Sequence, residues 1–313
     1  MRQLLVAVAL GAIAAQHEQP SLPLVDHHQH FFSPAYAARV NVASIDAGLL
    51  IGHLDAAGIR RAAVLSVAYG FSNPNRPPIE DDYAAVRSEN DWTSREVARF
   101  ADRLRGFCSV NPLRTYATEE IARCAEDPGL RTGLKLHFGN SDVRLENPEH
   151  VAKLRAVFAA ANAHRMAIVV HLRSTISQQR PYGKEQARSF LNDVLAAAPD
   201  VPVQIAHMAG AGGFEDPLVD QALSVFIDAI AARDAKMSRV YFDVSGVVGF
   251  TRDQNLDLIA NRIRQVGIER VLYGSDAATP TIGPREAWAA FRKLPLSAAE
   301  FQTIAANVAP YMK

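Results

Sequence analysis

The sequence predicts a single-domain (β/α)8 barrel, and three observations favour this fold class. Short β-branched or apolar runs alternate with longer amphipathic runs, which is the pattern of repeated strand–helix units. A chain of 313 residues with 49% hydrophobic content can bury one large core. Polar residues at the ends of successive apolar runs recur at steps of 34, 36, 36 and 33 residues, each the length of one strand–helix–strand unit. These residues are His137, His171, His207, Asp243 and Asp276.

The chain begins with a pattern typical of a secretory signal peptide. A positive start, Met1-Arg2-Gln3, precedes an apolar core from Leu4 to Ile13, and Ala12-Ile13-Ala14 offers small residues at a cleavage site. We expect residues 1–15 to be removed, so that an exported chain begins near Ala15 or Gln16. The alternative is a cytoplasmic enzyme with an N-terminal extension.

The charge balance and the hydropathy of the chain restrict the kinds of binding partner that it is expected to have. Lys plus Arg equals Asp plus Glu, at 33 each, and this neutrality argues against nucleic acid or an acidic membrane surface. Outside the leader, no apolar stretch reaches the roughly 18 residues of a membrane-spanning helix, so no membrane association is expected of the mature form. A small-molecule substrate is the expected partner. Whether the chain forms a homo-oligomer stays open.

Eight segments are expected to be strands, because each is a short run rich in β-branched or apolar residues. In order they are Val25–Phe31, Arg61–Val67, Phe107–Val110, Thr132–Phe138, Ala167–Leu172, Val201–Met208, Val240–Ser245 and Val271–Ser275. Between them, apolar residues recur at helical spacing, for example at Val151, Leu154, Val157 and Phe158. Asn147 is the expected cap of that helix, and Pro148 suits its first turn.

Three further features complete the predicted fold. The segment from Phe71 to Asp91 contains three prolines and is expected to be a long loop over the barrel mouth after the second strand. Ser297 to Met312 is expected to be a capped C-terminal helix on the barrel exterior or floor. The two cysteines, Cys108 and Cys124, are expected to be buried free thiols, since one pair does not make a disulfide framework.

A histidine cluster ends the first predicted strand. In an alternating strand His28 and His30 share one face with Asp26 behind them, while His27 and Gln29 face the other side. Two imidazoles on one face at a strand end can hold one metal cation. Such a site needs a third protein ligand, and His171 at the end of its own apolar strand is the best candidate.

Other strand ends supply the remaining candidates. Asp276 follows Gly274-Ser275 and is a candidate carboxylate ligand. His207 precedes a glycine-rich turn through which substrate or water could approach. Because active sites of this barrel lie at the C-terminal ends of the strands, all these side chains should meet there.

Three further residues are candidates for binding substrate. Lys135 and His137 share a strand face, and Arg173 lies two residues beyond His171, where together with Arg180 it could grip a carboxylate. For Lys135 three interpretations stay open. It could orient a substrate carboxylate or carbonyl, carry a carbamate that bridges two metal ions, or extend its ammonium to solvent.

At these motifs the sequence resembles the amidohydrolase superfamily. The motifs are Asp26-x-His28-x-His30, Gly133-x-Lys135-x-His137, His171, His207 with its glycines, and Gly274-Ser275-Asp276, in family order. The branch it resembles is that of amidohydrolase-related metal-dependent hydrolases, which includes the α-amino-β-carboxymuconate-ε-semialdehyde decarboxylase group. The resemblance implies one divalent metal ion, usually zinc, held by His28, His30, His171 and Asp276. It also implies that His207 activates the attacking water, and Asp276 could pass the proton to the leaving group. The leader departs from the mostly intracellular relatives.

Three functions therefore compete. The first is hydrolysis of a lactone, ester or amide by an activated water. The second is non-oxidative decarboxylation of an aromatic or muconate-like acid at the same site. The third is a binding protein whose metal only stabilises the barrel, but structural zinc sites are closed by four protein ligands and usually contain cysteine. We expect the hydrolase first and the decarboxylase second.

Overall fold

The fold is that of a computed structural model, which describes residues 22–214, 216–249, 255–277 and 282–313. The predicted signal peptide, residues 1–15, lies outside these residues. No described helix is both long enough and apolar enough to cross a membrane.

Among the described residues, eight parallel strands pair in chain order, which confirms the (β/α)8 barrel. They are β1 (Val25–Gln29), β2 (Arg61–Leu65), β3 (Leu104–Ser109), β4 (Gly133–His137), β5 (Ala167–His171), β6 (Val203–Ile205), β7 (Val240–Asp243) and β8 (Val271–Leu272). Two backbone hydrogen bonds join the last strand region to the first: His27 N donates to Tyr273 O and Asp276 N to His28 O, both at 2.9 Å. These bonds close the barrel at a seam between β8 and β1.

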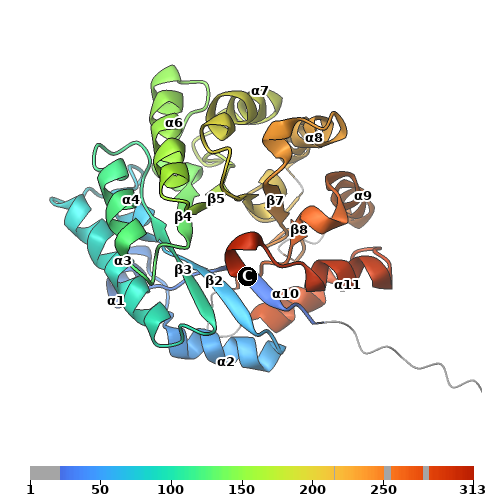
Figure 1. Ribbon diagram of the computed structural model, residues 1–313, viewed down its shortest axis with the longest axis horizontal. Helices are drawn as coiled ribbons and strands as arrows, with labels where there is room; N and C mark the ends of the chain where they lie inside the picture. The colour runs from blue at the N-terminus through green and yellow to red at the C-terminus, as the bar shows by residue number, and fades with distance from the viewer. Residues whose placement is uncertain (1–21, 215, 250–254, 278–281) are drawn as a thin grey trace, which may run out of the picture.

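Helices surround the strands, as the view along the barrel in Figure 1 shows. They are α1 (Pro34–Val40), α2 (Ala47–Ala57), α3 (Asp82–Ala98), α4 (Ala117–Glu126), α5 (Phe138–Ser141), α6 (Pro148–Ala163), α7 (Lys184–Ser189), α8 (Pro217–Ala231), α9 (Leu256–Val266), α10 (Pro284–Phe291) and α11 (Ala298–Ala306). Short 3₁₀ segments include η4 (Ala206–Ala209) and η7 (Pro310–Met312). As predicted, Asn147 caps α6, its side chain accepting from Glu149 N at 2.9 Å.

Several predicted boundaries differ from the structure; for example, β3 begins at Leu104 rather than Phe107, and β8 ends at Leu272 rather than Ser275. Two further differences have a clear physical cause. The long connection after β2 ends at Asp81 rather than Asp91, because the Asp81 side chain accepts from Ala84 N at 2.9 Å and caps α3. β6 ends at Ile205 rather than Met208, because His207 and Met208 have positive φ angles of 55° and 51° that no strand allows.

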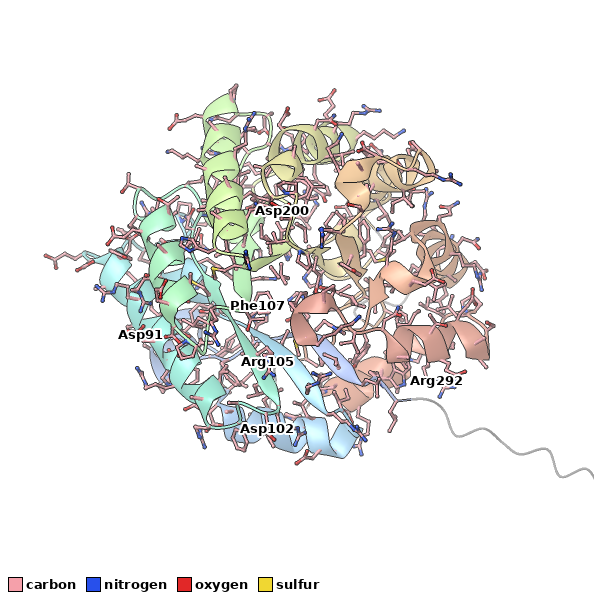
Figure 2. All side chains as sticks on the ribbon, in the orientation of Figure 1. Asp91, Asp102, Arg105, Phe107, Asp200 and Arg292 are labelled. Carbon is pink, nitrogen blue, oxygen red and sulfur yellow. A yellow bond between two sulfur atoms is a disulfide. The ribbon has the colours of Figure 1, made fainter. Side chains whose placement is uncertain are left out.

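The C-terminal segment covers the barrel outside and then its floor. Ser297 caps α11 in a reciprocal capping box with Glu300, as expected, but the helix ends at Ala306 rather than at Met312. Beyond α11 the chain turns inward, so that Met312 is buried with inward-facing residues including Val25, Ala63 and Phe107. Figure 2 labels Phe107 near the centre of the ring of helices.

The expectation of free thiols is wrong, because Cys108 on β3 and Cys124 on α4 form a disulfide. Both side chains are fully buried, and their Cα atoms lie 6.0 Å apart. The sequence separation of 16 gave no sign of this pairing, which depends on how α4 packs on β3. Disulfides persist in oxidising compartments, so the bond agrees with export, which stays a prediction.

We expect the double substitution Cys108→Ala/Cys124→Ala to lower the free energy of unfolding by about 3 kcal/mol, the typical contribution of a cross-link that closes a loop of this length. Urea unfolding of the variant and of the oxidised protein measures the difference. Alkylation under denaturing, non-reducing conditions is the control, since the oxidised chain should take up no label. Two labelled thiols in the wild-type chain would disprove the disulfide.

Candidate metal centre

The candidate metal centre lies at the seam where β1 meets β8. The pairing of β1 with β2 shifts in register between Asp26 and Gln29, so strict alternation along β1 is wrong. Gln29 donates to Asp26 Oδ2 at 2.8 Å, whereas His27 is bonded to Tyr273 O and Ala309 N. Asp26 also accepts from Ser275 N at 3.0 Å, which ties the first strand to the residue before Asp276.

The structure brings the five predicted ligand and catalytic residues to the C-terminal ends of the strands. His28 Nε2 lies 3.2 Å from His30 Nε2, and Asp276 Oδ1 lies 3.5 Å from His30 Nε2. His207 Nε2 lies 4.0 Å from Asp276 Oδ2, and the His171 and His207 ring centroids are 4.9 Å apart. Donor atoms of His28, His207 and Asp276 all lie within 4.8 Å of one another. His207 is therefore close enough to be either a ligand or a catalytic base.

Three of these imidazoles are oriented in the same way. The Nδ1 atom of His28 is 3.0 Å from Asp243 Oδ2, that of His30 is 2.6 Å from Leu65 O, and that of His207 is 2.8 Å from Ser245 O. An Nδ1–H that donates to an oxygen leaves Nε2 as the atom with a free lone pair. Nδ1 bonded to a carboxylate or carbonyl is typical of metal-binding histidines, so the donor set fits a divalent cation.

Burial favours the neutral form that a metal ligand needs. Burial, together with the charge of Lys135, lowers the pKa of the His28 imidazole to about 4 and that of His30 to about 3. The same burial holds the pKa of His171 well below its ordinary value, together with the neighbouring His137. These three imidazoles are therefore neutral at pH 7 and available to a cation.

Asp243, at the end of β7, holds two residues of the candidate metal centre, His28 and His207, through hydrogen bonds. The spacing of strand ends included it, but sequence reasoning assigned it no role. Its carboxylate is fully buried, with Oδ2 near Gln204 and His28, and Oδ1 accepting from the backbone of His207 and from Ser245. Burial raises the pKa of Asp243, but His28, His207 and Ser245 outweigh this and hold it below its usual range. An ionised Asp243 thus fixes His28 and the start of the His207 turn.

Backbone strain is concentrated at the same strand ends. Three successive non-glycine residues, His207, Met208 and Ala209, have φ of 55°, 51° and 68°, and Asp276 has φ of 49°. Left-handed backbone costs about 1–3 kcal/mol for such residues and persists where the surroundings enforce it. The bond from His207 N to Asp243 Oδ1, at 2.9 Å, is one such constraint. The strain points to a functional requirement for the positions of His207 and Asp276.

Two of the predicted substrate-binding residues, Lys135 and His137, lie beside the histidine cluster. Lys135 is 1% exposed, so the interpretation that its ammonium reaches solvent is wrong. Its Nζ lies 3.4 Å from His28 Nε2, and burial lowers the pKa of Lys135 to about 8. His137 stacks on His171 with ring centroids 3.8 Å apart.

Both candidate arginines already hold protein carboxylates. Arg173 Nη2 lies 2.9 Å from Asp216 Oδ2, and Arg180 Nε lies 2.7 Å from Asp142 Oδ1. Neither makes a contact with the histidine cluster in the hydrogen bonds and ion pairs of the described residues. A role for either in gripping substrate stays a prediction.

Comparison with known proteins agrees with the geometry. The family model described as amidohydrolase matches residues 25–307. This chain belongs to the amidohydrolase family, and is therefore an enzyme of the amidohydrolase superfamily. A search of curated protein sequences gives no significant match.

Three similar solved structures share the fold. A 5-carboxyvanillate decarboxylase from Sphingomonas paucimobilis is 17% identical, with a TM-score of 0.63 over 91% of this chain and 97% of that one. A probable 2-pyrone-4,6-dicarboxylic acid hydrolase from Acinetobacter baumannii is 17% identical, with a TM-score of 0.57 over 90% and 96%. An amidohydrolase from Burkholderia multivorans with bound zinc is 14% identical, with a TM-score of 0.60 over 91% and 96%.

Proposed function

We propose that this protein is a metal-dependent hydrolase that acts on the lactone, ester or amide carbonyl of a small substrate bearing a carboxylate. The observation that carries the proposal is the cluster of imidazoles whose Nδ1 atoms are bonded to oxygen atoms and whose Nε2 atoms lie near Asp276. We assign one divalent ion, zinc in the first instance, to His28, His30, His171 and Asp276. Such an ion would polarise the scissile carbonyl and lower the pKa of water to about 7.

His207 is the proposed general base. Because its Nδ1–H donates to Ser245 O at 2.8 Å, its Nε2 can accept the proton of the attacking water. Asp276, whose Oδ2 lies 4.0 Å from that Nε2, would pass the proton to the leaving group. The Asp243 carboxylate holds the His207 backbone, so the base keeps its position when the proton moves.

Lys135 supports the choice of a carboxylate-bearing substrate. Its Nζ lies 3.4 Å from His28 Nε2, the atom that would bind the cation, and no ion pair among the described residues includes Lys135. The carboxylates of Asp276 and Asp243 act on this ammonium without forming an ion pair with it, and a buried ammonium that no carboxylate contacts is costly. A substrate carboxylate would supply the missing contact.

Decarboxylation is the second candidate, favoured by the similar structure of a 5-carboxyvanillate decarboxylase. In that reaction the bond from a substrate carbon to its carboxylate breaks, its electron pair stays on carbon, and a proton replaces CO2. The same Lys135 would hold the carboxylate that is lost, and a protonated His207 would be the proton donor. The two reactions therefore use the same residues, but His207 accepts a proton in hydrolysis and donates one in decarboxylation.

A substrate panel on zinc-loaded and manganese-loaded protein distinguishes the candidates. Lactones, esters, amides and aromatic carboxylic acids are incubated with each form, and acid release and CO2 release are measured separately. Metal-dependent acid release supports the hydrolase, and CO2 release from an aromatic acid replaces it with the decarboxylase. Protein that binds no divalent ion would overturn both.

We expect Lys135→Met to raise KM for a carboxylate substrate and to lower kcat/KM about 10- to 100-fold, because a charged hydrogen bond is lost. Steady-state kinetics on the substrate found by the panel measures both parameters. The matched control is Lys153→Met, since Lys153 pairs with Glu149 on an exposed part of α6. If the wild-type protein carries two ions per chain and Lys135→Met carries one, the bridging carbamate is correct and the carboxylate role is wrong.

A further inference from the structure

The floor of the barrel, opposite the candidate metal centre, is closed by the C-terminal segment. Ala309 N donates to His27 Nε2 at 3.2 Å, and Arg61 Nη1, at the start of β2, donates to Met312 O. The Tyr311 ring packs edge-on against Phe107, with ring centroids 5.2 Å apart. These contacts fix η7 inside the N-terminal ends of the strands.

A line of buried hydrogen bonds runs from this floor to the metal centre. The Tyr311 hydroxyl donates to Gln204 Oε1, and Gln204 Nε2 donates to Asp243 Oδ2 at 2.6 Å. His28 Nδ1 donates to the same Asp243 oxygen at 3.0 Å. Gln204, Asp243 and His28 are all at most 1% exposed.

The direction of each bond in this line is fixed by chemistry. An ionised carboxylate only accepts, so the Asp243 oxygen must face the amide nitrogen of Gln204 rather than its oxygen. Gln204 Nε2 also donates to His27 O at 3.3 Å. The amide oxygen therefore faces Tyr311, and only the Tyr311 hydroxyl is bonded to it among the described side chains.

We propose that Tyr311 is a positioning residue for the metal centre, acting through Gln204 and Asp243 on the imidazole of His28. The inference rests on the proposed metal site but not on which reaction that site performs. Without the Tyr311 hydroxyl, the buried amide oxygen of Gln204 has no partner, and the amide is free to turn away from Asp243. Asp243 then holds His28 less firmly, and the affinity for the ion falls.

The test compares zinc affinity, by competition with a chromophoric chelator, in otherwise intact full-length protein. Tyr311→Phe keeps the ring packing and removes only the hydroxyl, and it should weaken binding about 2- to 10-fold, as loss of one hydrogen bond does. Gln204→Met removes all three hydrogen bonds of the amide and should weaken binding about 10- to 100-fold. The visible absorption bands of the cobalt-substituted protein should shift in both variants. Tyr83→Phe is the control, since the Tyr83 hydroxyl bonds the exposed side chain of Glu119 on the outer helices.

The double variant Tyr311→Phe/Gln204→Met separates a relay from general destabilisation. If Tyr311 acts through Gln204, the double variant binds zinc no more weakly than Gln204→Met alone. If the losses of zinc affinity in the two single variants add in the double variant, the relay is wrong and the metal site stands. The same conclusion follows if Tyr311→Phe has the wild-type zinc affinity and cobalt spectrum. A wild-type protein that binds neither zinc nor cobalt would overturn the metal site and the relay together.

Discussion

Replacing His28 with alanine is expected to reduce the metal content from about one divalent ion per chain to near zero. His28 is the imidazole with the most contacts in the centre, because its Nε2 lies 3.2 Å from His30 Nε2 and its Nδ1 is held by Asp243. Removing it takes away one ligand and the side chain that Asp243 orients. His171→Ala should have the same effect. Elemental analysis of the purified proteins after dialysis measures the occupancy.

His164→Ala is the matched control, since His164 is exposed and lies between α6 and the start of β5, whereas the site lies at the C-terminal ends of the strands. Circular dichroism should show the barrel folded in all three variants, because the hydrophobic core does not include these imidazoles. Full occupancy in both His28→Ala and His171→Ala would show that the assigned ligand set is wrong.

His207→Asn should keep the metal and lose most of the activity. Loss of a positioned acid or base typically costs 10²- to 10⁴-fold in rate, about 3–5 kcal/mol in the barrier. The proposed site already gives zinc four protein ligands, His28, His30, His171 and Asp276, so a fifth imidazole would leave little room for water. The expected result is a large fall in kcat with unchanged metal content, whichever reaction the substrate panel finds.

The same variant decides between the two positions that the geometry allows for His207. Its Nε2 lies 4.0 Å from Asp276 and within 4.8 Å of the His28 donor atom, close enough to belong to the ligand set. If metal and activity are lost together, His207 is a ligand and another residue is the base. If both are kept, the base lies elsewhere and Asp276 is the next candidate. Ser224→Ala, a substitution at a partly exposed position of α8, is the control for metal or activity lost during purification.

Much of the fold could be predicted because each strand–helix unit leaves a local signal. The polar residues from His137 to Asp276 end buried apolar runs, and the structure places them at the C-terminal ends of their strands or just beyond. The limits of β6 could not be predicted, because the backbone turn at His207 is imposed by Asp243, a residue 36 positions away. The disulfide was missed for the same reason: Cys108 and Cys124 meet only through tertiary packing.

Of the candidate site, the sequence predicted which residues gather but not how they are held. His28, His30, His171, His207 and Asp276 lie together as expected. Alternation along β1 failed at His27, because the register shift there depends on pairing with β2. Neither the arginine pairs with Asp216 and Asp142 nor the bonds of Asp243 to His28, Gln204 and His207 have a local pattern, since each joins residues more than 30 positions apart.

Because the candidate metal centre lies across the seam between β8 and β1, binding of the proposed metal ion would report a late step of folding. His28 and Asp276 stand on opposite sides of that seam, 248 positions apart in the chain, and the bond from Asp276 N to His28 O joins them only when the sheet becomes a closed ring. Contacts of such long sequence separation form late, because the entropy of closing so large a loop must be overcome first. An intermediate with seven paired strands would already show most of the native circular dichroism, yet it would present His28 and His30 without their carboxylate. Tight binding of a cation would therefore report closure of the barrel, a step that circular dichroism does not resolve.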